Sequence, residues 1–278
     1  MTDKELVIVI DNSNRFNAIF FTLAKEFQIS ITQLGRKCEL SWGNVQTNAR
    51  KLIFGAHNSP EYWQENSTPD DIIVNLEAFH SRLWRRRNPR YLDLLENKCV
   101  FEYSQKNLLY LENKHFFKIP PMYSYLRPTK VKDLDILFNG SRNVYRNEML
   151  NKIKETGLNL QVDFNVLLDD VFHAFDRSWI YLNLDLDEHS DFNDHRFMQC
   201  AMSNTLFVGH SGDIINHTEM EKLIGISIFE KDEDVIEGLQ RLISDKTELI
   251  KAFSTQYQIA QENKKLFDEF VERQFGVK

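Results

Sequence analysis

Three short apolar segments between Val131 and His210 each end in polar residues, and this pattern restricts the fold more than any other feature of the chain. Residues 134–138 run into Asn139-Gly140-Ser141-Arg142, residues 179–183 end at Asn183, and residues 205–208 lead to Gly209-His210. Parallel sheets covered on both faces have such continuously apolar strands. Domains of this kind bind ligands at the carboxyl ends of the strands. The sequence therefore predicts an α/β domain with a ligand site at these ends.

The first half of the chain shows the same alternation. Apolar segments at 6–10, 51–54, 71–74 and 99–101 end at Asp11, at Gly55-Ala56-His57, at Asn75-Leu76-Glu77 and at Glu102-Tyr103-Ser104. Helical patterns follow at about 16–27 and 91–97. Regular alternation of buried strands with helices favours a doubly wound parallel sheet.

The second half of the sequence predicts further helices and strands, and the whole chain is expected to divide into two domains. Helices are expected over 144–156, 169–177 and 196–203, strands over 159–162 and 225–229, and an almost entirely helical chain after Asp232. The sequence Ile119-Pro120-Pro121 interrupts the pattern. We predict two Rossmann-like domains facing a cleft, residues 1–125 and 126–250, with a C-terminal helix at 251–278 that packs back on the first domain.

Composition excludes several classes of protein. The net charge of −7 argues against a protein whose whole surface grips nucleic acid, although local basic patches remain open. The three cysteines lack the spacing of a disulfide framework or a zinc site. No apolar run is long enough to span a membrane, and the first residues do not form a signal peptide. We expect a soluble, cytoplasmic protein, at most peripheral to an inner membrane.

The order of these segments resembles that of the GT-B glycosyltransferases, near the family-1-like and CgeB-like group. The resemblance rests on Asp71-Ile-Ile-Val-Asn-Leu-Glu77, Tyr91-Leu-Asp-Leu-Leu95, Val100-Phe-Glu-Tyr-Ser104 with Asn107, Asp135-Ile-Leu-Phe-Asn-Gly-Ser141 and the segment at Arg196. It implies a nucleotide sugar, expected to be a UDP sugar, on the second domain and an acceptor on the first. The chain departs from the pattern at Gln199, where many relatives have glutamate, and at Ser203-Asn204, where they usually have glycine.

Glycosyl transfer leaves negative charge on the departing phosphate, and the resemblance implies that helix N-termini and basic side chains neutralise it without a required metal. The donor-binding candidates are Gly140, Ser141, Arg142, Arg146, Asn183, His189, Arg196 and His210. The alternative for the arginines is a solvated helix face. The acidic residues around Asp185 and Glu188 are interpreted as a solvated loop rather than a cation site.

An inverting reaction also needs a base for the acceptor hydroxyl, and a carboxylate or imidazole at a strand end is suitable. Glu77, His57 and Asp11 are the candidates, with Glu77 first because it directly follows an apolar strand. Their alternative roles are structural: a helix-terminal carboxylate for Glu77, a hydrogen-bond partner for His57 and a helix cap for Asp11.

A run of arginines stands out against the acidic composition. It extends from Arg82 through Arg85, Arg86 and Arg87 to Arg90, and with Tyr103 it is the candidate acceptor-binding surface. Such a run suits an anionic acceptor, because guanidinium groups bind phosphates. The expected acceptor is a surface glycan or lipid-linked saccharide, and the alternative is hydroxymethylated DNA modified by a phage enzyme in its host's cytoplasm. The alternative for the arginine run is an exposed loop or a helix that balances nearby acidic residues. The alternative for the whole protein is a catalytically inactive GT-B-like binding subunit.

Overall fold

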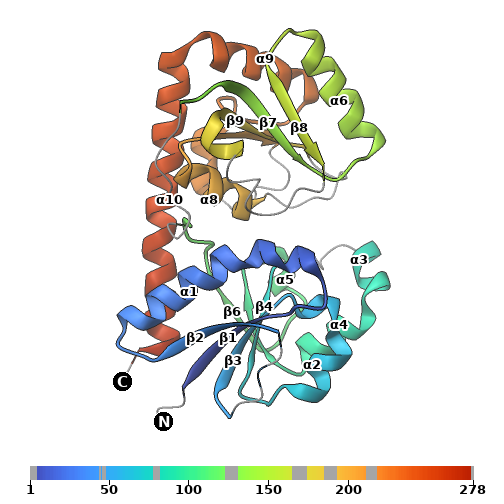
Figure 1. The fold of residues 1–278 in the computed structure, drawn as a ribbon, viewed down its shortest axis with the longest axis vertical. Helices are drawn as coiled ribbons and strands as arrows, with labels where there is room; N and C mark the ends of the chain where they lie inside the picture. Colours follow the sequence, from blue (N-terminus) through green and yellow to red (C-terminus); the bar gives the residue numbers. More distant parts are fainter. Residues whose placement is uncertain are drawn as a thin grey trace. The chain divides into compact units, whose positions relative to one another are not determined.

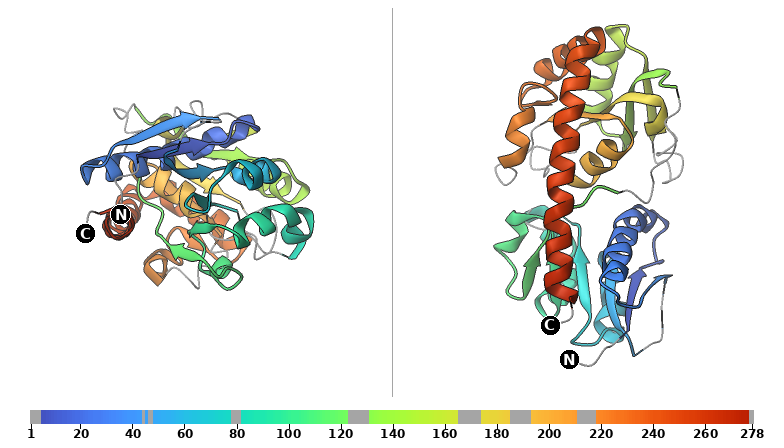
Figure 2. Two further views of the ribbon diagram at one scale, coloured as in Figure 1. Left: turned by 90° about the horizontal axis from the view of Figure 1, so that it is seen from below. Right: turned by 90° about the vertical axis from the view of Figure 1, so that its left-hand side faces the viewer.

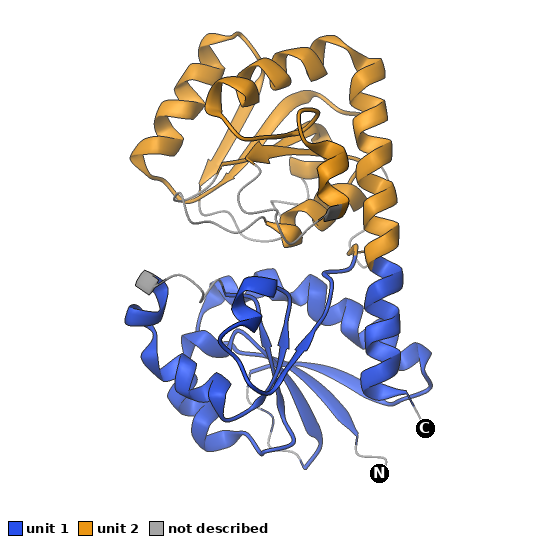
Figure 3. Ribbon diagram, turned by 180° about the vertical axis from the view of Figure 1, so that it is seen from behind, with its two compact units in different colours: residues 1–120, 264–278 blue, residues 121–263 orange. Residues whose placement is uncertain are grey.

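The computed structural model describes residues 5–43, 45, 48–77, 82–122, 131–164, 174–184, 193–210 and 218–276. The chain forms two compact units, coloured blue and orange in Figure 3. Unit 1 comprises Met1–Pro120 and Lys264–Lys278, and unit 2 comprises Pro121–Asn263. Each unit is built around its own sheet.

The sheet of unit 1 has six strands in the order β2-β1-β3-β4-β5-β6, and every pairing described in it is parallel (Figure 1). Its strands are β1 (Leu6–Ile10), β2 (Cys38–Trp42), β3 (Arg50–Phe54), β4 (Ile72–Asn75), β5 (Cys99–Glu102) and β6 (Lys114–Phe116). Its helices are the 3-10 helices η1 (Arg15–Phe20) and η2 (Ala56–Asn58) and the α-helices α1 (Phe21–Gln33), α2 (Pro60–Asn66), α3 (Arg82–Arg87), α4 (Pro89–Glu96) and α5 (Gln105–Leu108).

Both faces of this sheet are buried, which explains its continuously apolar strands. On one face Val9, Ile53 and Ile73 pack in a cluster with Trp63 of α2 and Tyr91 of α4. On the other face, aromatic side chains from α1, β3, β5, the residue after β6 and the C-terminal helix pack together: Phe27, Phe54, Phe101, Phe117, Phe267 and Phe270. A strand with side chains on both buried faces has no room for alternating polar residues.

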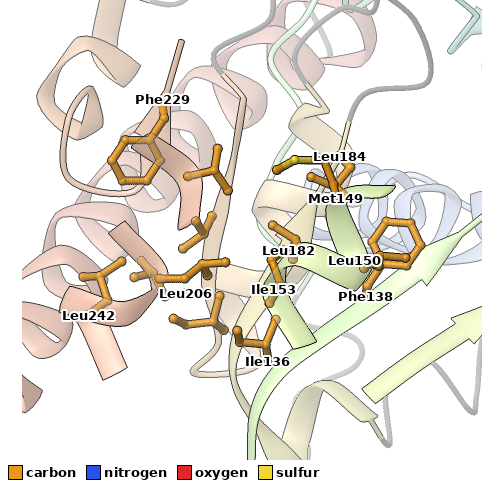
Figure 4. Close-up of a cluster of buried hydrophobic side chains, with 14 of the residues drawn as sticks. Ile136, Phe138, Met149, Leu150, Ile153, Leu182, Leu184, Leu206, Phe229 and Leu242 are labelled. Carbon is orange, nitrogen blue, oxygen red and sulfur yellow. The ribbon is translucent and has the colours of Figure 1, made fainter. Parts of the chain in front are cut away.

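Unit 2 contains a second parallel sheet, in the order β11-β10-β9-β7-β8. Its strands are β7 (Leu134–Gly140), β8 (Leu160–Phe164), β9 (Ser178–Asn183), β10 (Leu206–His210) and β11 (Ile228–Phe229). Its helices are α6 (Val144–Glu155), α8 (Asp194–Met202), the 3-10 helix η5 (Thr218–Leu223), α9 (Asp232–Ser244) and the first part of α10 (Lys246–Phe275). The core on one face joins Ile136, Leu182 and Leu206 of the sheet to Ile153 of α6 and Leu242 of α9 (Figure 4).

Helix α10 is continuous and contributes residues to both units (Figure 2). In unit 2 the buried Gln256 accepts a hydrogen bond from the Phe207 N–H at 2.8 Å and donates to the Thr205 carbonyl at 2.9 Å. In unit 1 Asp268 accepts from the hydroxyl of Ser30 on α1 at 2.9 Å. The predicted fold class, with its C-terminal helix returning to the first sheet, is therefore confirmed.

Several elements differ from the sequence expectation. The segment expected as one helix over 16–27 is a 3-10 helix followed by α1, which continues to Gln33. The strand expected over 225–229 is reduced to Ile228–Phe229. The edge strand β2 and the short strand β6 have too little apolar periodicity to be recognised, since both are partly exposed. Within the described residues, no helix combines the length and apolar character needed to cross a membrane.

Candidate functional site

The two sheets share one winding, because each places its first strand between the second and the third. In unit 1 the reversal of strand order lies between β1 and β3, and in unit 2 it lies between β7 and β9. Loops that leave such a pair of strands in opposite directions open a crevice at the carboxyl ends, where doubly wound domains bind ligands. Each unit therefore has its own set of candidate residues after these strands.

Asp11 follows β1, and its carboxylate is occupied by hydrogen bonds. It accepts from the Ser13 N–H at 2.8 Å, from the hydroxyls of Ser13 and Ser59, and from Trp63 Nε1 at 2.5 Å. The residue is only 3% exposed. The cap of the following helix is Asn14 rather than Asp11. A carboxylate whose lone pairs are filled by protein donors is also a poor acceptor for a substrate proton.

His57 lies just after β3, where Gly55 turns the chain with a φ of +78°. Asn58 Nδ2 donates to Asn17 Oδ1 at 2.7 Å and lies 2.8 Å from His57 Nε2. This amide therefore donates to Nε2, which must carry a lone pair. Burial lowers the pKa of His57 to about 4, and the nearby Asp11 raises it by a smaller amount. His57 is thus a neutral hydrogen-bond acceptor at neutral pH, and it is too weak a base to take a proton from an acceptor hydroxyl.

The structure brings Glu77 and His57 together. Glu77 Oε1 lies 3.4 Å from His57 Nε2, and the Glu77 side chain keeps 27% of its surface exposed. Packing around the carboxyl raises its pKa to about 7, and a hydrogen bond from Trp84 offsets part of that increase. A neutral His57 cannot stabilise the carboxylate by charge. Glu77 is therefore a partly accessible carboxyl that changes its protonation state near neutral pH, as a general base requires.

Behind Glu77 is a buried polar network that sequence reasoning did not assign to the site. Asn75, Tyr91, Glu102 and Asn107 are all buried and hydrogen-bonded to one another or to the Glu77 backbone. Desolvation raises the pKa of Glu102 to about 8, against hydrogen bonds that lower it. The available signal was that β4 and β5 end in Asn and Glu, which are rare choices for fully buried positions.

In unit 2 the basic side chains after β7 bind the protein's own backbone and rings. Arg146 donates to the Leu184 carbonyl after β9 at 2.6 and 3.0 Å, and to Ser141 Oγ at 2.9 Å. The Arg142 guanidinium lies 4.3 Å from the centre of the Phe164 ring. Gly140 ends β7, and Ser141 and Arg142 lie between it and α6. Arg146 thus joins the loops that follow β7 and β9.

Arg196 lies in the first turn of α8, whose cap Asn193 accepts from the Arg196 N–H at 3.1 Å. Its guanidinium donates to Gln199 Oε1 at 2.9 Å and lies 5.8 Å from the centre of the Tyr181 ring. Gln199 Nε2 in turn lies 3.0 Å from His195 Nε2. The glutamine at this position therefore binds the guanidinium through its amide oxygen, without forming an ion pair.

His210 and Asn183 end β10 and β9 beside each other. His210 Nε2 lies 2.9 Å from Asp232 Oδ1, which also accepts from the Tyr145 hydroxyl at 2.7 Å. The strands approach closely here, since a Cβ on Gly209 would lie 2.4 Å from the Asn183 carbonyl oxygen. His210 is thus fixed by a carboxylate at the strand end. His189, the remaining candidate for binding the nucleotide sugar, lies outside the described residues.

The arginine run forms helix α3 and the start of α4. Arg86 and Arg87 are exposed, Arg85 lies 4.4 Å from the centre of the Tyr110 ring, and Arg90 pairs with Glu61. Trp84, also on α3, is the residue that hydrogen-bonds Glu77. Tyr103 directly follows β5 and is half-buried. The helix that carries the exposed arginines therefore also contacts the candidate base.

No group of three His, Cys, Asp or Glu side chains that could hold a metal ion occurs in the part of the chain that the structure describes. The acidic segment around Asp185 lies outside that part.

No protein-family model and no curated protein sequence matches this chain. Solved structures resemble it over nearly its whole length. A phage T4 β-glucosyltransferase in complex with UDP and Mn2+ has a TM-score of 0.63 at 13% identity, covering 96% of this chain and 98% of that one. An α-glucosyltransferase in complex with UDP and a 13-mer DNA containing a HMU base has a TM-score of 0.60 at 11% identity, with coverage of 96% and 99%.

A third similar structure is AviGT4, a glycosyltransferase involved in avilamycin A biosynthesis, with a TM-score of 0.55 at 8% identity and 99% coverage of both chains. The chain therefore has the GT-B glycosyltransferase fold. The sequence prediction of this fold is confirmed, whereas the narrower CgeB-like group has no counterpart among these structures.

Proposed function

We propose that this protein is a glycosyltransferase that transfers a sugar from a UDP sugar to an acceptor hydroxyl, with Glu77 as the general base. The observation that carries the proposal is the Glu77 carboxyl, partly exposed at a strand end, 3.4 Å from a neutral histidine and with a pKa of about 7. At neutral pH a large fraction is ionised and able to take a proton. The whole-length likeness to glucosyltransferases crystallised with UDP supports the donor class.

On the donor side, we propose that the loops after β7, β9 and β10 bind the nucleotide sugar. Ser141 and Arg142 follow β7, and Arg196 lies in the first turn of α8. Their N–H and O–H groups would neutralise the negative charge that develops on the leaving phosphate. Arg146 acts by holding the loops together through Leu184 and Ser141. Binding by these groups needs no metal.

For the acceptor, we propose DNA that carries hydroxymethylated pyrimidines. The supporting observation is helix α3, on which Arg86 and Arg87 are exposed while Trp84 hydrogen-bonds the candidate base. Phosphate contacts by these arginines would bring an anionic acceptor to Glu77. A saccharide acceptor is the second candidate, because the likeness to AviGT4 also extends over 99% of both chains.

The proposal is tested in two stages. Thermal shift with UDP, GDP, CDP and their sugars identifies the donor, because a ligand that binds only the folded state raises the melting temperature. Release of the nucleoside diphosphate is then followed with duplexes that contain or lack hydroxymethylated pyrimidines, and with a saccharide panel. Transfer to the modified duplex alone is the expected result. Donor binding without transfer or hydrolysis would instead identify an inactive binding subunit.

A further inference from the structure

The Glu77 backbone is held by side chains from separate segments. Glu77 N–H donates to Asn75 Oδ1 at 3.2 Å, and Asn75 Nδ2 donates back to the Glu77 carbonyl at 3.0 Å. Asn107 Nδ2, from α5, donates to the same carbonyl at 2.7 Å. Two side-chain amides therefore bind both polar groups of Glu77, which fixes the backbone from which its carboxyl extends.

These two amides can bind the Glu77 backbone only in one orientation, with their NH2 groups toward its carbonyl. Glu102 selects that orientation. It is the register partner of Asn75 at the ends of β4 and β5, and it accepts from Asn75 Nδ2 at 2.7 Å and from Asn107 Nδ2 at 3.2 Å. Both Glu102 oxygens accept hydrogen bonds in this arrangement, and an accepting oxygen favours an NH2 group rather than a carbonyl oxygen on each neighbour. The Tyr91 hydroxyl donates to Asn75 Oδ1 at 2.9 Å and secures the other end of that amide.

The burial of Glu102 is expensive and has no compensating cation. Its side chain is fully buried, and among the described residues no lysine, arginine or histidine forms an ion pair with it. The Ser104 N–H and the two asparagine amides are its hydrogen-bond donors. A buried carboxyl without a paired cation lowers the stability of the fold, whereas an apolar residue at the same position would not. A carboxyl at this buried position is explained if it orients the amides.

We propose that Glu102 is a positioning residue for Glu77, acting through the side-chain amides of Asn75 and Asn107. Its role in turnover rests on the proposed function, in which Glu77 is the base. Its role in ordering the Glu77 backbone does not, because that role depends only on the hydrogen bonds within unit 1. The two parts can therefore be measured separately.

The test variant is Glu102→Gln, which keeps the shape and replaces one carboxylate oxygen by an NH2 group. That group faces the NH2 of Asn75 or of Asn107, so one hydrogen bond is lost and the amides are free to flip. Hydrogen exchange of the Glu77 amide, followed by NMR, should become at least about tenfold faster. The kcat for glycosyl transfer should fall by about 10- to 100-fold because the base is misplaced, while KM for the donor stays within about twofold.

The matched control is Asp71→Asn at the opposite end of β4. Asp71 is also a fully buried carboxylate, and it accepts from the Lys51 N–H at 2.8 Å and the Thr68 N–H at 2.7 Å. Unlike Glu102 it also pairs with a cation, since Lys51 Nζ lies 3.4 Å from Asp71 Oδ2. This variant should lose stability without a change in kcat or in exchange at Glu77. Equal losses of kcat in both variants would reduce Glu102 to a structural role and overturn the proposal.

Unchanged exchange at Glu77 in a folded Glu102→Gln variant would also overturn it. If that variant does not fold, Tyr91→Phe removes only the hydrogen bond to Asn75 Oδ1 and should show the same two effects at smaller size. Absence of either effect in Tyr91→Phe would then count against the network. A wild-type protein that transfers no sugar would refute the proposed function, while the exchange measurement would still decide the ordering of Glu77.

Discussion

The strand ends of the two units differ in chemistry although their sheets are wound in the same order. At the ends of β3 to β5 in unit 1 are an imidazole, two carboxyls with raised pKa values and a set of asparagines. At the ends of β7 and β9 in unit 2, and on α8, are arginines, a serine and asparagine caps. The winding fixes where a ligand binds, and the side chains at the strand ends fix whether that place handles protons or negative charge.

The largest effect is expected from removal of the Glu77 carboxylate in unit 1. Glu77→Gln keeps the shape of the side chain and should lower turnover by about 10²- to 10⁴-fold, since general base catalysis contributes on that scale. Donor affinity, measured by calorimetry with UDP, should stay the same because the proposed donor site lies in unit 2. Turnover within a few-fold of wild type would return Glu77 to a structural role.

Removal of a cation from unit 2 should lower nucleotide affinity, which the Glu77 variant leaves unchanged. Arg196→Ala should weaken UDP binding by about 1.5–3 kcal/mol, or about 10- to 150-fold, as expected for a hydrogen bond between charged groups. Calorimetry with UDP, GDP and CDP measures the change. The control is Arg177→Ala, which removes an arginine paired with Asp133 at the amino end of β9 and should leave nucleotide affinity unchanged. Equal affinities in wild type and Arg196→Ala would remove Arg196 from the site.

The pH dependence of turnover sharpens the comparison further. Because burial raises the pKa of Glu77 to about 7, the active carboxylate form is lost as the pH falls below that value. The kcat should be about half of its plateau at pH 7 and about one tenth at pH 6. Burial lowers the pKa of His57 to about 4, so this residue should contribute no ionisation in the same range. A flat profile between pH 5.5 and about 8 would exclude Glu77 as the base.

The smallest expected effect concerns the exposed arginines of α3. Changing Arg86 and Arg87 to alanine should flatten the dependence of DNA affinity on salt by about 0.9 for each phosphate that is no longer neutralised, with little change in donor binding. Binding is measured over a salt series with a duplex that contains hydroxymethylated pyrimidines. The double change Lys152→Ala with Lys154→Ala removes two exposed cations from α6 and should leave the slope unaltered. Wild-type protein that does not bind DNA at low salt would favour a saccharide acceptor.

Much of the fold was predictable because its signals are local. Continuous apolar strands such as 6–10 and 134–138, each followed by polar residues and a helix, indicate a doubly wound sheet whatever the rest of the chain does. The weak elements were not predictable for the same reason. Strand β2, Cys38-Glu-Leu-Ser-Trp42, is a partly exposed edge strand that is held by its pairing with β1 rather than by its own pattern.

For the site, the sequence by itself determined which groups stand at strand ends, and so Glu77, His57 and Asp11 could be named as candidates. Their different roles were decided by tertiary structure. Asp11 is occupied by Ser13, Ser59 and Trp63, His57 is neutral because it is buried beside Asn58, and Glu77 has a pKa near neutrality because the packing around its carboxyl excludes water. Hydrogen-bond partners from distant segments and the loss of water at a buried carboxyl arise only when the chain is folded, and these set the chemistry of each group.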